Sequence, residues 1–170
     1  VGKYVTQFEE QIATFTGARY AVAMMNGTTA LQIALQLAGV ERGNEVITQA
    51  LSFVATANAI SHAGGIPVFI DVDTDTLGMS PEKLRVWLEL NSKIDEKTGQ
   101  CINKTSGNTI SAIIPMHTFG HPCRIVEIIE VADEYGIQVI EDAAESLGSY
   151  YRGKHTGTFG LLGILSFNGN

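Results

Sequence analysis

Features that mark several classes of protein are scarce in this sequence. Its 170 residues contain only two cysteines, Cys101 and Cys123, and these form neither a CxxC pair nor a zinc-ligand spacing. The pattern excludes a disulfide framework and a zinc site, so no metal is expected, and it favours a reducing, cytoplasmic setting.

Basic charge and long apolar runs are also scarce. The chain has 11 basic and 18 acidic residues and a net charge of −7, which argues against a nucleic-acid surface or a membrane-docking face. No apolar run is long enough to span a bilayer. The first residues, VGKYVTQFEE, lack the layout of a signal peptide.

What is present is sufficient for a folded core. Hydrophobic residues make up 45% of the chain and charged residues 17%, which fits one domain or one layer-complete piece of a larger domain. The mean hydropathy of +0.12 indicates a buried sheet or a large subunit interface. The chain opens within an amphipathic pattern and closes on the strand-like LLGILSFNGN, so we expect residues 1–170 to be an incomplete domain.

The hydrophobic pattern predicts alternating helices and strands. Apolar runs predict buried strands at 21–25, 45–48, 66–72, 110–116 and 137–142; helices are expected over 3–16, 30–39, 53–64, from Ser80 onward, and over 125–136. The first helix would bury the face that carries Tyr4, Phe8, Ile12 and Phe15. The polar, turn-rich stretch 91–109 reads as an exposed hairpin-like insertion. Strands that are apolar throughout are typical of a mostly parallel α/β sheet covered on both faces, whose sites lie at the carboxyl ends of the strands.

Two such strand ends carry candidate binding groups. Asn26-Gly27-Thr28-Thr29 lies between an apolar run and a helix, where backbone N–H groups and hydroxyls can hold a phosphate; an ordinary helix cap is the alternative. Asp142 directly follows a strand, so it either holds a cationic group or caps the next helix. Glu141 would point to the opposite face and pair structurally. Glu145 would share a face with Asp142 if a helical turn begins there, as in a variant capping box.

An aromatic ring and a hydroxyl complete the candidate set. Phe53 follows the strand after the cradle helix and can stack on a flat ring, although core packing is the alternative. Ser166 follows the last apolar run, where an ordinary turn is the alternative. His117 and His121 are read as structural, and Lys154 with His155 as a polar loop. A flat, phosphorylated, cationic heterocycle would use the cradle, the aromatic ring and the carboxylate together.

Four segments in order, NGTTAL, LSFVATANAI, EDAAESLGS and LSFNGN, resemble the DegT/DnrJ/EryC1/StrS family of sugar aminotransferases, which use pyridoxal phosphate. Shorter segments, including VGKYV and PMHTFGHP, are most similar to nucleotide-sugar 4-aminotransferases of legionaminic-acid-type pathways. The resemblance implies an aspartate-aminotransferase-like (fold type I) large domain, with a mainly parallel mixed sheet, in a homodimer with shared active sites.

The resemblance also implies roles for residues. Gly27 and Thr28 would hold the cofactor phosphate, Phe53 would stack on the pyridine ring and Asp142 would bind its nitrogen. Ser166, with Asn168, would reach the phosphate from the other side. Glu145 falls near the phenolic oxygen, where many members have Gln or His. The lysine that forms a Schiff base with the cofactor is expected immediately after Asn170.

The implied reaction moves an amino group, from glutamate by analogy, to a keto group at C4 of a nucleotide-linked sugar. Two alternatives stay open. A family dehydratase would have His in place of the lysine, and a non-catalytic phosphate- or nucleotide-binding α/β domain would use the cradle without a covalent cofactor.

Overall fold

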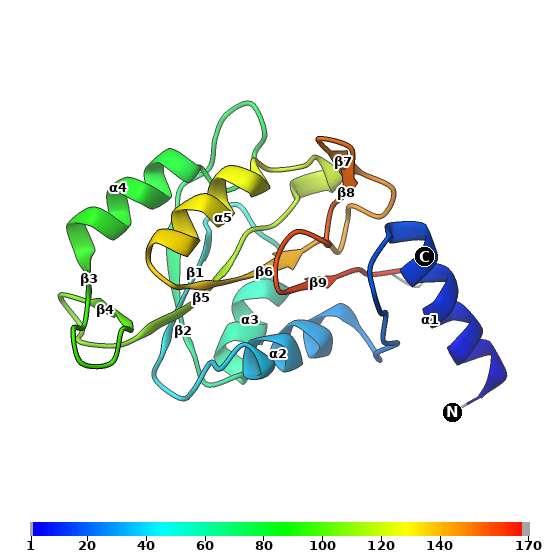
Figure 1. Ribbon diagram of the computed structural model, residues 1–170, viewed down its shortest axis with the longest axis horizontal. Coiled ribbons are helices and arrows are strands. Elements are labelled where there is room, and N and C mark those ends of the chain that lie inside the picture. Colours follow the sequence, from blue (N-terminus) through cyan, green and yellow to red (C-terminus); the bar gives the residue numbers. More distant parts are fainter. Residues whose placement is uncertain (1, 168–170) are drawn as a thin grey trace.

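The computed structural model describes residues 2–167 (Figure 1). Its helices are α1 (Lys3–Thr16), α2 (Gly27–Leu37), α3 (Val54–His62), α4 (Pro81–Asn91) and α5 (Ile125–Glu134), with one short 3-10 turn at Thr118–Gly120. Its strands are β1 (Glu45–Gln49), β2 (Ile66–Ile70), β3 (Ser92–Ile94), β4 (Cys101–Asn103), β5 (Ile110–Ile114), β6 (Gln138–Asp142), β7 (Tyr150–Tyr151), β8 (Lys154–His155) and β9 (Leu162–Ile164).

A parallel sheet organises the fold. Five strands lie in the order β2-β1-β5-β6-β9, and each neighbouring pair is parallel. Helices α4 and α5 lie over one face and α2 and α3 over the other, while α1 stands apart beside the β9 end (Figure 1). The predicted α/β architecture, with helices on both faces of a mainly parallel sheet, is confirmed.

Neighbouring residues of each central strand supply the two cores. Val46 of β1 packs with α2 and α3, whereas Ile47, the next residue, packs with α4 and α5. Every residue of β1 is buried, so its apolar residues serve the two cores, while its polar residues Glu45, Thr48 and Gln49 make hydrogen bonds inside the protein.

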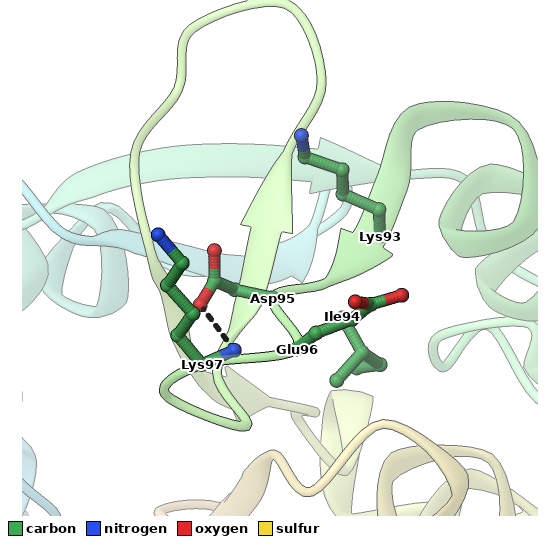
Figure 2. A pocket seen from close by; sticks show the side chains of 5 residues that line it. All are labelled: Lys93, Ile94, Asp95, Glu96 and Lys97. Atoms are coloured by element: carbon green, nitrogen blue, oxygen red, sulfur yellow. Dashed lines mark hydrogen bonds between the residues drawn. The ribbon is translucent and has the colours of Figure 1, made fainter.

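The predicted insertion at 91–109 is confirmed as an antiparallel hairpin of β3 and β4. Buried Glu45, at the start of β1, accepts hydrogen bonds from Asn103 Nδ2 at 2.7 Å and Ser106 Oγ at 2.5 Å, which fasten the base of the hairpin. Beyond that base, the segment from Lys93 to Lys97 bends around an open hollow of about 310 Å³, where Lys97 N–H donates to Asp95 Oδ1 (Figure 2). This hollow lies far from the carboxyl ends of the strands.

The predicted strand at 21–25 is wrong. The segment has no strand structure, and Val22 and Met25 are 75% and 89% exposed. A strand exists only where a neighbour accepts its backbone hydrogen bonds. Among residues 2–167 no strand pairs with this segment, and the N–H of Ala23 instead donates to Glu9 Oε1 at 2.8 Å.

The first helix forms as predicted, but its expected burial is wrong. Tyr4 is 83% exposed and Phe15 54% exposed, so only part of the apolar stripe is covered. Phe8 meets Phe167 edge to face, and Phe15 meets the ring of His155. His155, read from the sequence as part of a polar loop, is in fact buried in the β7–β8 hairpin.

Candidate functional site

Asp142 occupies the carboxyl end of β6, and only 3% of the residue is exposed. Its Oδ2 accepts a 2.6 Å hydrogen bond from Thr56 Oγ1, and its Oδ1 accepts a 3.3 Å bond from the N–H of Ala144. Burial raises the pKa of the Asp142 carboxyl above its ordinary value, although these two bonds act in the opposite direction. Within residues 2–167 no Lys or Arg side chain pairs with it, so the carboxylate is suited to receive a cationic group.

Phe53 is the residue before α3, and its ring is 66% exposed. The alternative that Phe53 is a core residue is therefore wrong. The ring lines a hollow of about 130 Å³ together with Leu51, Ser52, Met116, Thr118, Phe119 and Glu145. Because α3 begins at Val54 and carries Thr56 in its first turn, the same turn that presents the Phe53 ring also binds Asp142.

Gly27 and Ser166 face each other across a narrow gap. A Cβ added to Gly27 would lie 3.7 Å from Ser166 Cβ and 3.9 Å from Ser166 Oγ. Gly27 opens α2, and Asn26 caps this helix by accepting the N–H of Thr29 at 2.8 Å. Thr28 is partly buried in the first turn. Backbone N–H groups at a helix start, with a hydroxyl opposite, make a place for an anion.

These three parts of the candidate site lie close together. The same added Cβ on Gly27 would lie 3.8 Å from Ile164, which pairs with Asp142 in the sheet. Asp142 binds Thr56, and the N–H of Thr56 donates to the carbonyl of Phe53. The cradle, the buried carboxyl and the exposed ring are thus joined by a continuous set of contacts. Asn168, also predicted to bind the phosphate, lies outside the described residues.

Glu145 does not share a helical turn with Asp142. Residues 143–149 form turns, with Ser146 N–H donating to Ala143 O and Ser149 N–H to Ser146 O, so the alternative of a capping box, which required a helical turn here, is wrong. Glu145 Oε2 instead accepts a 2.8 Å hydrogen bond from the N–H of Phe119. Phe119 has a φ of 54°, an unfavourable conformation for a non-glycine residue, and the carboxylate holds it there at the edge of the hollow.

Glu141 and His117 form a buried pair behind Asp142. His117 Nε2 lies 3.0 Å from Glu141 Oε2, and both side chains are fully buried. His117 Nδ1 accepts the N–H of Cys123 at 3.2 Å, so we assign the ring proton to Nε2. The expected structural pairing of Glu141 on the face opposite Asp142 is confirmed, but its partner was not predicted.

Gln49 is a further buried polar residue beside the candidate site that the sequence analysis did not single out. Its buried amide closes the end of β1: Oε1 accepts the N–H groups of Met79 and Met116, and Nε2 donates to Leu51 O and Thr118 Oγ1. The only signal in the sequence is a polar residue ending an apolar run. Its partners fix the walls of the hollow beside Phe53.

The arrangement fits a flat, phosphorylated, cationic ring. The cradle between Gly27 and Ser166 is one that a side chain would fill. The Asp142 carboxyl is buried and pairs with no Lys or Arg among the described residues, and Phe53 is exposed. No group of three or more His, Cys, Asp or Glu side chains in residues 2–167 is placed to hold a metal ion. None of the described helices has the length and apolarity needed to cross a membrane.

Comparison with known proteins agrees with this geometry. The model of the DegT/DnrJ/EryC1/StrS aminotransferase family matches residues 1–170. The chain belongs to this family. It is 44% identical over 170 residues to EpsN of Bacillus subtilis (strain 168), which is assigned to the pyridoxal phosphate-dependent aminotransferases, and 38% identical over 169 residues to GDP-perosamine synthase of Escherichia coli O157:H7. The alignments cover 100% and 99% of this chain but 41% and 42% of those relatives, so the chain spans about two fifths of their length.

Solved structures agree as well. A DegT/DnrJ/EryC1/StrS aminotransferase from Brucella abortus superimposes with a TM-score of 0.88 at 32% identity, covering 99% of this chain and 42% of that one. A second neighbour, NtdA of Bacillus subtilis, was solved with its cofactor PMP (TM-score 0.75, 31% identity, 92% of this chain and 32% of that one). The dehydratase ColD, solved with GDP-perosamine, is also similar (TM-score 0.78, 28% identity, 96% and 39%). The expected family, fold and cofactor class are confirmed; the roles of individual residues stay predictions.

Proposed function

We propose that this chain forms the cofactor-binding part of an aminotransferase that transfers an amino group to the keto group of a nucleotide-linked sugar. The observation that carries the proposal is the buried carboxyl of Asp142, bound by Thr56 in the same turn that presents the Phe53 ring. The anion cradle that we propose at Gly27 and Ser166 adjoins Ile164, the residue that pairs with Asp142 in the sheet.

Each residue has a distinct task in this proposal. Pyridoxal phosphate, when bound, supplies an electron-withdrawing ring that stabilises negative charge at the carbon losing a proton. Asp142 keeps the ring nitrogen protonated, because a buried carboxylate favours a nearby cation. Phe53 covers one face of the ring and excludes water from it. Gly27, Thr28 and Ser166, with Asn168, hold the phosphate, and Glu145 lies at the edge of the hollow.

The nature of the sugar is supported by the relatives rather than by this chain's own contacts. The name of the Escherichia coli relative gives a GDP-linked amino sugar as its product, and the name of ColD gives a GDP-linked 4-keto sugar as its substrate. We therefore propose a nucleotide-linked keto sugar as acceptor, amination at C4, and glutamate as amino donor. Incubation with a GDP- or UDP-linked 4-keto sugar and labelled glutamate, followed by NMR of the product, tests all three.

Spectroscopy of the protein as its gene encodes it tests the cofactor proposal. We expect a visible absorption band with pyridoxal phosphate, which borohydride abolishes and which glutamate shifts. A lysine immediately after Asn170 is part of this expectation. A protein that shows no cofactor band at all would instead be a non-catalytic phosphate- or nucleotide-binding domain.

The dehydratase is the second candidate, favoured by the similarity to ColD. Histidine at the position after Asn170 and a deoxygenated product without transferred nitrogen would support it over the aminotransferase.

We also propose a homodimer with shared active sites, in keeping with the exposed apolar residues Val22, Met25 and Tyr4. Light scattering that gives the mass of a monomer would contradict the dimer.

A further inference from the structure

Glu141 receives an unusual number of hydrogen bonds for one side chain. The N–H of Gly157 donates to its Oε2 at 2.7 Å, and the N–H groups of Phe159 and Gly160 donate to its Oε1 at 2.6 and 2.8 Å. His117 Nε2 adds the fourth bond. Three of the four donors are therefore backbone groups of one loop, 157–160, which the carboxylate gathers against β6.

That loop leads directly to the phosphate side of the site. It is followed by β9, whose Ile164 pairs with Asp142, and Ser166 comes two residues later beside Gly27. We propose that Glu141, held in place by His117, is a positioning residue that sets the location of Ser166 and thereby the affinity for the phosphate of the cofactor. This inference rests on the proposed function.

Tight packing transmits the position of the loop to β9. A Cβ added to Gly160 would lie 2.5 Å from Val139 O, and one added to Gly157 would lie 3.1 Å from Ala143 Cβ. A Cβ on Gly163, inside β9, would collide with the carbonyl of Gly157. Because backbone approaches backbone this closely, the loop and β9 cannot shift independently of each other.

The chemistry of Glu141 suits a fixed anchor. Burial acts to raise the pKa of its carboxyl, but the bonds from His117, Gly160 and Gly157 outweigh it and hold this pKa below the ordinary value. The side chain is therefore ionised at neutral pH, and charge-assisted hydrogen bonds are the stronger kind. His117 is fixed in turn by Cys123 on its other nitrogen.

Comparing the binding of pyridoxal phosphate with that of pyridoxal distinguishes a positioning role of Glu141 from a general effect on stability. Pyridoxal lacks the phosphate, so its binding should not depend on Ser166. The dissociation constants of pyridoxal phosphate and pyridoxal are measured by absorbance titration for the unaltered protein, Glu141→Gln, Ser166→Ala and the double variant. In Glu141→Gln we expect the constant for pyridoxal phosphate to rise about tenfold and that for pyridoxal to change by less than about twofold.

The double variant supplies the decisive comparison. If Glu141 acts through Ser166, Glu141→Gln should weaken pyridoxal phosphate binding by less than about twofold once Ser166 is alanine. Equal losses for both ligands, or effects that multiply in the double variant, would overturn the inference. Glu127→Gln is the matched control: Glu127 also accepts bonds from a hairpin, through Tyr151 and Arg152, but it lies on α5, and both constants should stay unchanged.

A second variant covers the case in which Glu141→Gln does not fold. His117→Gln removes one of the four donors and leaves the carboxylate in place; we expect a selective rise of about threefold for pyridoxal phosphate. No selective rise in either variant would overturn the inference while leaving the proposed function intact. An unaltered protein that binds neither ligand would overturn the proposed function itself.

Discussion

Thr56 Oγ1 lies 2.6 Å from Asp142 Oδ2 and joins the first turn of α3 to the end of β6. Ser52 Oγ in turn donates to Thr56 Oγ1 at 3.0 Å. Two hydroxyls in series therefore align the Asp142 carboxyl with the loop that carries Phe53. Because contacts within the chain hold Asp142 in place, effects of substitutions on stability and on cofactor binding can be measured separately.

Replacing Thr56 by valine removes the hydroxyl and nearly preserves the shape of the side chain. Because the lost bond is donated to a buried carboxylate, we expect the free energy of unfolding at pH 7 to fall by about 1.5–3 kcal/mol, measured by urea denaturation. Thr56→Ser keeps the donor and should lose less than about 1 kcal/mol. A loss in Thr56→Val no larger than the loss in Thr56→Ser would contradict a stabilising role of the hydroxyl.

Replacing Asp142 by asparagine should stabilise the cofactor-free protein at neutral pH. Burial raises the pKa of Asp142 in the folded state, so the folded protein binds this proton more tightly than the unfolded chain does. The stability of the unaltered protein therefore gains from Asp142 as the pH falls through the folded-state pKa. Asn cannot ionise, so Asp142→Asn should melt higher at pH 7, with a difference that shrinks toward about pH 4.

The same variant tests the catalytic role of Asp142. We expect it to bind pyridoxal phosphate but to lose about 100-fold or more in turnover, because the amide no longer favours a protonated ring nitrogen. A variant with near-normal turnover contradicts the role of Asp142. A melting difference that is absent at every pH contradicts the account of its burial.

Replacing Gly27 by alanine should affect binding without harming the fold. The new methyl group would lie 3.7 Å from Ser166 Cβ, an ordinary contact, and Gly27 has no positive φ, so alanine can take the first position of α2. The methyl group nevertheless occupies the cradle, so the dissociation constant of pyridoxal phosphate should rise about tenfold or more. Gly2→Ala, before α1 with no atom within 4 Å, is the control and should leave binding unchanged.

Replacing Phe53 by alanine should cost less than about 1 kcal/mol of stability, because the ring is 66% exposed. Loss of stacking should raise the dissociation constant of pyridoxal phosphate by about 3- to 10-fold. Phe53→Tyr keeps a ring and should bind within about twofold of the unaltered protein. If the alanine variant binds equally well, the ring does not cover the cofactor.

Much of the fold could be predicted because the central strands are buried on both faces. Largely apolar runs identified β1, β5 and β6, and Ser80 before Pro81 correctly marked the start of α4. The run at 21–25 is also apolar, but its Val22, Met24 and Met25 are exposed. Composition cannot tell whether a strand has a neighbour, since pairing depends on residues far away in the chain.

The candidate site was only partly predictable for the same reason. Gly27 and Asp142 stand at ends of apolar runs, where topology alone brings functional residues together. Gln49 bonds to Thr118, 69 residues away, and Glu141 to His117, 24 residues away. Buried polar partners of this kind leave no local pattern, so only the structure reveals them.

The hairpin of β3 and β4 offers an experimental handle. The hairpin leads into the amino end of β5, whereas the candidate site lies at the carboxyl ends of the strands. Glu45 forms hydrogen bonds to the base of the hairpin and not to its tip. A fluorophore or a tether attached at exposed Lys97 would thus report on, or immobilise, the molecule from the end remote from its chemistry.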